Sequence, residues 1–161
     1  MITKEDKKYL KMLDRMEPKS PCKRAKIAAI IVKNGKILVK AVNHPYKFYN
    51  LKKLGCLRTK LKIKSGTRRE VGCGLCAEQY AIAEAARKGI ALKGATIYIS
   101  KHPCRICEGF IVETGIKRVV YQEGYPDPVP SIDILEGGKV KIEQDTESAE
   151  IKKTPKSKLH T

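Results

Sequence analysis

The stretch ATIYISKHPCRICEGFIVETGIKRVVYQ, residues 95–122, decides the fold of this chain. An apolar run rich in β-branched residues opens it (95–100) and a similar run closes it (117–122), so both predict strands. Between them, residues 104–114 predict a helix, because Pro103 precedes this segment and Gly115 follows it. Strand, helix and strand in this order predict two parallel strands with the helix packed on their sheet.

The segments on either side extend the same α/β pattern. Residues 26–42 hold two apolar runs around Asn34-Gly35, which is a strong hairpin signal. Residues 44–74 show no clear period and predict a long loop, and a loop of this length is usually functional. The other expected elements are a capped N-terminal helix from Thr3 to Pro18, a helix from Cys76 to Gly89, a turn-rich connection at 125–130, a short helix at 131–136 and an edge strand at 139–143.

Length and composition indicate one domain, residues 1–144, followed by a charged, disordered tail, residues 145–161. The formal net charge is +17. Nine basic residues and no acidic one lie between Lys47 and Arg69. Such a block attracts phosphates, so we expect either a solvated basic surface or a nucleotide or nucleic-acid partner.

The six cysteines indicate metal binding rather than disulfides. No apolar run approaches the ~18 residues of a membrane span, and the charged N-terminus does not resemble a signal peptide. We therefore expect a cytoplasmic protein with no membrane partner. In the cytoplasm thiols stay reduced and commonly bind metals or react.

Three of these cysteines are predicted to converge on one metal ion. Cys104 and Cys107 form a C-x-x-C pair on the first turn of one helix, and Cys76 opens another helix with Glu78 two residues later. If the two helices begin side by side, three thiolates meet and leave a fourth zinc position open, the catalytic pattern. Glu78 is then placed to carry a proton for a zinc-activated water.

Two other interpretations of these cysteines stay open. Cys73 or Cys56 could complete a closed, purely structural site of four sulfurs. Alternatively, the C-x-x-C pair could be a redox motif. Neither alternative requires Cys-Ala-Glu at the start of a helix.

Cys-Ala-Glu at 76–78 and Pro-Cys-Arg-Ile-Cys at 103–107 match the three-cysteine form of the zinc deaminase motif. Around it, SPCKRAKIAAIIV (20–32), the stretch at 55–82, the stretch at 103–121 and YPDP (125–128) are similar to the deoxycytidylate deaminase family, so the resemblance covers about residues 3–143. It implies a three-layer α/β/α, cytidine-deaminase-like fold with a mixed sheet of about five strands.

Three positions depart from the pattern of that family. Cysteine stands at 76 where the branch usually has histidine, His44 replaces a glycine, and Tyr80 stands where asparagine is usual. Reaction type is therefore better defined than substrate.

The resemblance implies hydrolytic deamination of a cytosine nucleotide, most simply dCMP to dUMP and ammonia, with Glu78 protonating N3 of the ring and assisting the departure of ammonia. It also implies that the backbone around Ala77 binds the pyrimidine edge, and Asn43 is our candidate for the sugar hydroxyl. The candidate ligands of the 5′-phosphate are Arg58, Lys64, Arg68 and Arg69. Three thiolates make the zinc site electron-rich, so Arg105 and the helix N–H groups are expected to offset the excess negative charge.

The remaining cysteines, Cys22, Cys56 and Cys73, lie in stretches that match the family. Some members hold a second, structural zinc, and these three thiols could form such a site with Glu70 or His44. Buried free thiols or one disulfide are the alternatives.

Three functions remain to be separated. The chain could deaminate a mononucleotide, act on a polymer such as tRNA or single-stranded DNA, or bind nucleic acid with a zinc that is only structural. The family resemblance favours the first and implies a homo-oligomer, whereas the net charge of +17 favours a nucleic-acid partner.

Overall fold

The computed structural model describes residues 1–124 and 132–147 of the chain. Its helices are α1 (Lys4–Met16), the 3₁₀ turn η1 (Glu17–Lys19), α2 (Leu51–Leu54), α3 (Leu57–Lys60), α4 (Ala77–Arg87), α5 (Arg105–Glu113) and α6 (Ile132–Gly137). Its strands are β1 (Ala28–Lys33), β2 (Lys36–Val42), β3 (His44–Pro45), β4 (Gly74–Leu75), β5 (Thr96–Lys101), β6 (Arg118–Glu123) and β7 (Lys141–Gln144). The expected connection at 125–130 lies outside the described residues.

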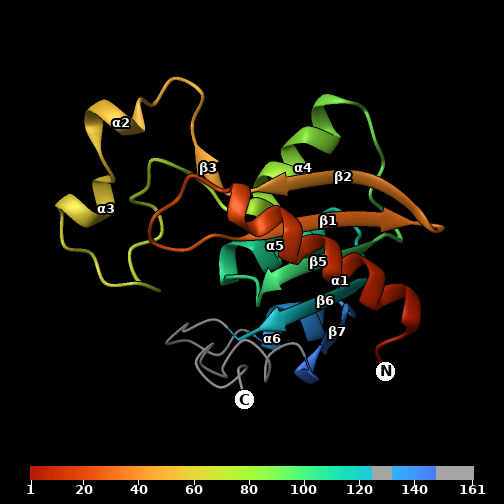
Figure 1. The fold of residues 1–161 in the computed structure, drawn as a ribbon. Coiled ribbons are helices and arrows are strands. Elements are labelled where there is room, and N and C mark those ends of the chain that lie inside the picture. Colours follow the sequence, from red (N-terminus) through yellow and green to blue (C-terminus); the bar gives the residue numbers. More distant parts are fainter. Residues whose placement is uncertain (125–131, 148–161) are drawn as a thin grey trace, which may run out of the picture.

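Five of the strands form one mixed sheet in the order β2-β1-β5-β6-β7 (Figure 1). Strand β1 runs antiparallel to β2 and to β5, whereas β5, β6 and β7 are parallel. Helices α5 and α6 lie in the two connections between the parallel strands, which a parallel pair requires. The predicted strand–helix–strand unit is thus confirmed.

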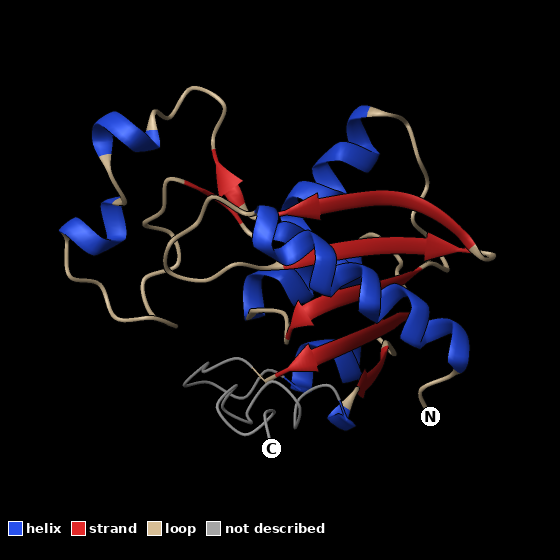
Figure 2. Ribbon diagram, in the orientation of Figure 1, coloured by secondary structure: helices blue, strands red, loops and turns tan. Residues whose placement is uncertain are grey.

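Helices cover both faces of this sheet (Figure 2). On one face, Leu10 and Leu13 of α1 pack against Ile30 of β1 and Tyr98 of β5. On the other face, side chains of α4 and α5 pack against the alternate residues of the strands, among them Ile31. Together they form a second buried cluster. Because successive strand side chains point to opposite faces, β1 contributes to both layers. The three-layer α/β/α fold is confirmed.

Two local predictions are also confirmed. Asn34 and Gly35 both have positive φ, 50° and 71°, as a two-residue type I′ hairpin turn requires. At the start of α1, the Thr3 side chain accepts from the backbone N–H of Asp6, and the Asp6 carboxylate accepts from the backbone N–H of Thr3. This reciprocal pair is a capping box.

The prediction of a long loop at 44–74 is wrong in part, because this segment contains β3, α2, α3 and β4. Strands β3 and β4 pair antiparallel, with Pro45 opposite Gly74. A Cβ at Gly74 would lie 1.9 Å from the carbonyl oxygen of His44, so only glycine allows this pairing. The pair ties both ends of the segment to the edge of the domain, while α2 and α3 extend away from the main sheet (Figure 1).

The expected domain boundary at residue 144 stays a prediction, and the next residue packs against the sheet. The side chain of Asp145 is buried, and its backbone N–H donates to the carbonyl of Tyr121 at 2.8 Å. Residues 148–161, most of the expected tail, lie outside the described residues. Across the two described ranges, every helix is too short or too polar for a membrane crossing.

Candidate metal centre and pocket

Helices α4 and α5 pack against each other, and each begins directly after a cysteine. Cys76 is the N-cap of α4 and Cys104 is the N-cap of α5. Both residues have extended backbone, which is ordinary for an N-cap and turns the side chain towards the first helical turn. The two cysteines therefore lie where the free N–H groups and positive dipole ends of the helices favour thiolates.

The sulfurs of Cys76, Cys104 and Cys107 all lie within 4.8 Å of one another. The Sγ atoms of Cys104 and Cys107 are 3.3 Å apart. Tetrahedral zinc with Zn–S bonds of about 2.3 Å separates its sulfurs by about 3.8 Å. Among the described residues, this is the cluster whose donors and spacing fit a metal ion.

The protonation of the three thiols depends on their mutual contacts. The hydrogen bond with Cys107 lowers the pKa of Cys104, whereas the hydrogen bond with Cys104 raises the pKa of Cys76 and of Cys107. One thiolate is thus favoured and further ionisation is opposed. A divalent cation would remove this opposition, because a coordinated thiol is deprotonated.

Glu78 lies in the first turn of α4 with only 3% of its surface exposed. Its Oε2 atom is buried and has no hydrogen-bond partner within the described residues. Burial, and after it the charge of Cys104, raises the pKa of Glu78 to about 7. A buried carboxylate in this position is suited to holding and releasing a proton near neutral pH.

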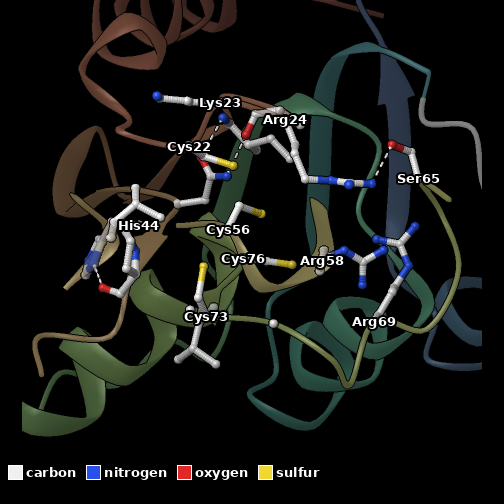
Figure 3. A pocket seen from close by; sticks show the side chains of 18 of the residues that line it. Cys22, Lys23, Arg24, His44, Cys56, Arg58, Ser65, Arg69, Cys73 and Cys76 are labelled. Atoms are coloured by element: carbon white, nitrogen blue, oxygen red, sulfur yellow. Dashed lines mark hydrogen bonds between the residues drawn. The ribbon is translucent and has the colours of Figure 1, made fainter. Parts of the chain in front are cut away.

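A pocket of about 220 Å³ adjoins the cluster through Cys76 (Figure 3). Its walls come from the β1 and β3 ends of the domain and from the 51–76 segment. Figure 3 shows the side chains of Arg24, Arg58 and Arg69 gathered on one side of the pocket, near Ser65. This end of the pocket is cationic, as binding of a phosphate would require.

Arg58 does not have the free guanidinium that a phosphate ligand needs. Its two terminal nitrogens donate to the backbone carbonyls of Lys64, Thr67, Arg68 and Val71. These four bonds use all four terminal N–H groups. The expectation that Arg58 grips phosphate is corrected accordingly: Arg58 organises the 64–71 loop.

The other basic candidates separate clearly. Arg68 is paired with Glu70, both side chains are largely exposed, and neither Arg68 nor Lys64 lines the pocket. Arg69 does line the pocket, and its charge lowers the pKa of Glu78 and of Cys104. Of the four expected phosphate ligands, Arg58 and Arg69 line the pocket.

Arg105 has a carboxylate partner in α6, and its expected electrostatic support of the cysteines stays a prediction. Its guanidinium forms a double hydrogen bond with the carboxylate of Asp133 in α6, at 3.0 and 3.1 Å. The charge of Arg69 lowers the pKa of Cys104 and of Glu78. The sequence could not show the effect of Arg69, because Arg69 reaches the motif through the loop.

Asn43 lines the pocket, and its side chain also forms hydrogen bonds that stabilise the fold. Its Oδ1 accepts from the backbone N–H of Ile27 and from Ser20 Oγ, both at 2.8 Å, and its amide nitrogen donates to the carbonyl of Ala25 at 2.7 Å. One amide N–H is left for a ligand. Ala77 has a fully buried side chain at the start of α4.

Cys22, Cys56 and Cys73 line the opposite side of the same pocket. Figure 3 shows their sulfurs turned towards a common space. Burial and then the nearby Cys56 and Cys22 raise the pKa of Cys73. Among the described residues, the sulfurs of Cys22, Cys56 and Cys73 lie farther apart than those of Cys76, Cys104 and Cys107. All six cysteines are free thiols.

Sequence reasoning missed three contacts at this site. Gln79 Oε1 accepts from the backbone N–H of Cys76 at 3.1 Å and completes a capping box there. Arg24 donates to the carbonyl of Ile63 at 2.7 Å and lines the pocket. The rings of His44 and Tyr80 stack with centroids 3.7 Å apart. The spacing of Cys76 and Gln79 was the one local signal available.

Fold and site together define a metal-binding α/β protein in which two helix N-termini support a cluster of three cysteines. Residues 3–123 match the family model described as the cytidine and deoxycytidylate deaminase zinc-binding region. The chain belongs to this family. The match and the sulfur cluster together support zinc as the metal.

The particular relatives are deoxycytidylate deaminases. The chain is 28% identical over 142 residues to the enzyme of Saccharomyces cerevisiae, covering 86% of this chain and 44% of the relative. It is 26% identical to the dCMP deaminase of cyanophage S-TIM5, whose structure was solved in complex with dCMP and dUMP. That comparison has a TM-score of 0.70 and covers 89% of this chain and 99% of the phage chain. The chain spans less than half the length of the yeast relative.

Proposed function

We propose that this protein hydrolyses dCMP to dUMP and ammonia. The observation that carries the proposal is the placement of Glu78, a buried carboxylate two residues after one sulfur of the cysteine cluster. A purely structural zinc site or a redox pair has no use for this carboxylate. The similarity to deoxycytidylate deaminases supports the same reaction and the same substrate.

In the proposed reaction, Cys76, Cys104 and Cys107 hold the zinc. Bound there, zinc supplies the Lewis acid that makes a water acidic near neutral pH. Glu78 accepts a proton from this water and delivers it to N3 of the cytosine ring. The oxygen of the water adds to C4, and the C4–N4 bond then breaks. Glu78 passes a proton to N4, so ammonia leaves and uracil remains.

Arg69 is proposed to bind the 5′-phosphate, with Arg24 beside it in the same cationic end of the pocket. A guanidinium can bind two phosphate oxygens at once, which fixes the nucleotide in the pocket. Asn43 is proposed to offer its remaining N–H to the sugar, and the backbone around Ala77 to bind the pyrimidine edge. Arg58 acts indirectly, because it holds the loop that carries Arg69.

An ammonia-release assay over dCMP, CMP, dCTP, deoxycytidine and a cytosine-containing oligonucleotide tests the proposal. We expect dCMP to be the preferred substrate. Glu78→Gln should retain zinc and lose turnover by orders of magnitude, since the amide keeps the shape and cannot carry the proton. Zinc bound with turnover retained in this variant would overturn the acid–base role of Glu78.

A second zinc at Cys22, Cys56 and Cys73 is also proposed. Three thiols facing one space, with His44 in the same pocket wall, support it. A metal held by these three thiols would fix the 56–73 segment. Metal analysis of the purified protein should give two zinc ions per chain, and Cys73→Ser should reduce the count to one. One zinc per chain in the unmodified protein would exclude this second site.

We further propose a homo-oligomer and a cytosolic location. Exposed apolar side chains on α5, Ile106 and Phe110, support self-association, and six free thiols support a reducing compartment. Light scattering on the purified protein tests the first, and Phe110→Lys should lower the measured mass if α5 lies in the contact.

A further inference from the structure

The segment 46–64, called here the basic arm, extends away from the main sheet (Figure 2). It contains α2 and α3, each only four residues long. Leu51, Gly55 and Arg58 form part of the pocket wall, so the arm is continuous with the proposed active site. Cys56 lines the pocket as well, whereas the exposed side chains of the arm, among them Phe48, Lys52 and Lys53, do not line it and are not explained by dCMP deamination.

The first of these features is an aromatic pair, in which Tyr46 is half-buried and Phe48 is exposed. The rings of Tyr46 and Phe48 are nearly parallel, with 5° between their planes and centroids 5.4 Å apart. The Phe48 side chain is 86% exposed. Burying such a ring would stabilise the fold by about 1.5–3 kcal/mol. Because Phe48 stays in water, the fold does not gain this stabilisation. A flat, exposed ring supported by a second ring is suited to stacking on another planar group.

The second feature is the charge around this ring pair. Six lysines of the arm are exposed: Lys47, Lys52, Lys53, Lys60, Lys62 and Lys64. No acidic residue occurs from 47 to 69. Among the described residues, the lysines that form ion pairs, such as Lys7 and Lys101, lie outside the arm. The charges of the arm are therefore available to an external anion.

We propose that the basic arm binds single-stranded nucleic acid, with a base stacked on Phe48 and the neighbouring phosphates held by the lysines of α2 and α3. Exposed aromatic rings within a positively charged surface are the pattern by which proteins bind single strands without reading their sequence. A duplex hides the faces of its bases, so it cannot use the ring of Phe48. A membrane-surface helix needs a continuous apolar face, which two four-residue helices do not provide.

Binding at the arm is separate from turnover in the pocket. Phe48, Lys52 and Lys53 do not line the pocket, and none is a metal ligand. Substitutions there should leave dCMP deamination unchanged. The inference therefore stands even if the proposed substrate proves wrong.

The test uses the zinc-loaded full chain and a fluorescent oligothymidylate of about 20 nucleotides, followed by fluorescence anisotropy. Thymine cannot be deaminated, so the signal reports binding alone. We expect binding to weaken steeply between about 50 and 200 mM salt, because phosphate contacts release counterions. Phe48→Ala should weaken binding about tenfold or more, within the range of about 1–3 kcal/mol for one stacked base.

Matched variants separate the arm from the general charge of the protein. Phe110→Ala removes another exposed phenylalanine, on α5, and should leave binding unchanged. Lys52→Glu with Lys53→Glu should abolish most binding, whereas Lys4→Glu with Lys11→Glu, the same charge change on α1, should have little effect. Circular dichroism confirms that each variant is folded.

Three results would overturn the proposal. One is the absence of binding by the unmodified protein at about 50 mM salt. Another is equal loss of affinity in the arm and α1 charge pairs, which would mean that net charge alone attracts the oligonucleotide. The third is tighter binding of an equally long duplex or of heparin with no effect of Phe48→Ala, which would indicate an unspecific polyanion surface.

Discussion

The Sγ atoms of Cys104 and Cys107 lie 3.3 Å apart at the start of α5, and both side chains are buried. A third thiol, from α4, lies beside these two. The three thiols cannot all ionise unless a cation is present, because their negative charges repel one another. We predict that Cys107→Ser removes zinc from this centre and abolishes ammonia release. Zinc content and turnover are measured on the same preparation.

Cys22→Ser is the matched control for that experiment, because it makes the same atom exchange outside the three-sulfur cluster. It should retain the zinc of the Cys76, Cys104 and Cys107 centre. Equal loss of turnover in the two variants would contradict a distinct catalytic centre.

Arg58 is predicted to act through loop structure. Arg58→Lys keeps the positive charge but cannot replace four hydrogen bonds from two terminal nitrogens, so it should behave nearly as badly as Arg58→Ala. Hydrogen bonds from a charged donor contribute about 1.5–3 kcal/mol each to stability, and partial exposure here favours the lower end. Thermal unfolding should show lower stability in both variants. Full rescue by lysine would instead mean that Arg58 serves as a point charge.

Arg69 is predicted to recognise the phosphate. Arg69→Gln should lower kcat/KM for dCMP by about 10- to 100-fold, the effect of losing about 1.4–2.8 kcal/mol of charged hydrogen bonding. The same variant should change kcat/KM for deoxycytidine much less, because that substrate has no phosphate. Arg68→Gln, which alters an exposed neighbour, is the control. A proportional loss on both substrates would assign Arg69 to the chemistry at the ring.

The contact between Asp6 and Arg118 predicts how stability depends on pH. Burial alone would raise the pKa of Asp6, but the hydrogen bonds from Arg118, Thr3 and Tyr98 outweigh it and hold that pKa well below its usual range. Burial is similarly outweighed at Glu143, where contacts with the N-terminal amine and Arg118 lower the pKa to about 2.

A lowered carboxylate pKa stabilises the fold above the unfolded-state value of about 4, and this stabilisation is lost as pH falls towards the folded-state value. We therefore predict that the free energy of unfolding decreases from about pH 4 to about pH 2. Asp6→Asn should be less stable at neutral pH and lose less on acidification. Urea unfolding at several pH values measures both effects, and an unchanged pH slope in the variant would contradict the assignment.

Gly74 is predicted to be essential for the β3–β4 pair. Gly74→Ala places a methyl group against the His44 carbonyl, so the pairing must open, and we expect a loss of more than about 2 kcal/mol of stability together with a raised KM. Gly109→Ala in α5 is the control. No atom lies within 4 Å of its added Cβ, so this change should stabilise the helix by about 0.5–1 kcal/mol. Equal melting temperatures for the two variants would refute the close approach.

The sequence by itself determined those features whose causes are local. The hairpin turn at Asn34-Gly35 follows from backbone freedom at two residues, and the capping box of Thr3 and Asp6 follows from their spacing. The helix predicted between the strands at 95–100 and 117–122 indicated that these two strands are parallel. The positions of Cys76 and Cys104 at two helix starts made their convergence predictable.

Only the tertiary structure decided the contacts made between distant segments. Sequence spacing placed Arg105 beside the cysteines, yet its guanidinium binds Asp133, while Arg69 acts on the site from the loop that Arg58 holds. The order of the strands, with β1 antiparallel to β5, likewise has no local signal. Side-chain direction across a folded loop depends on how the whole chain closes, and residue type and spacing do not encode that separately.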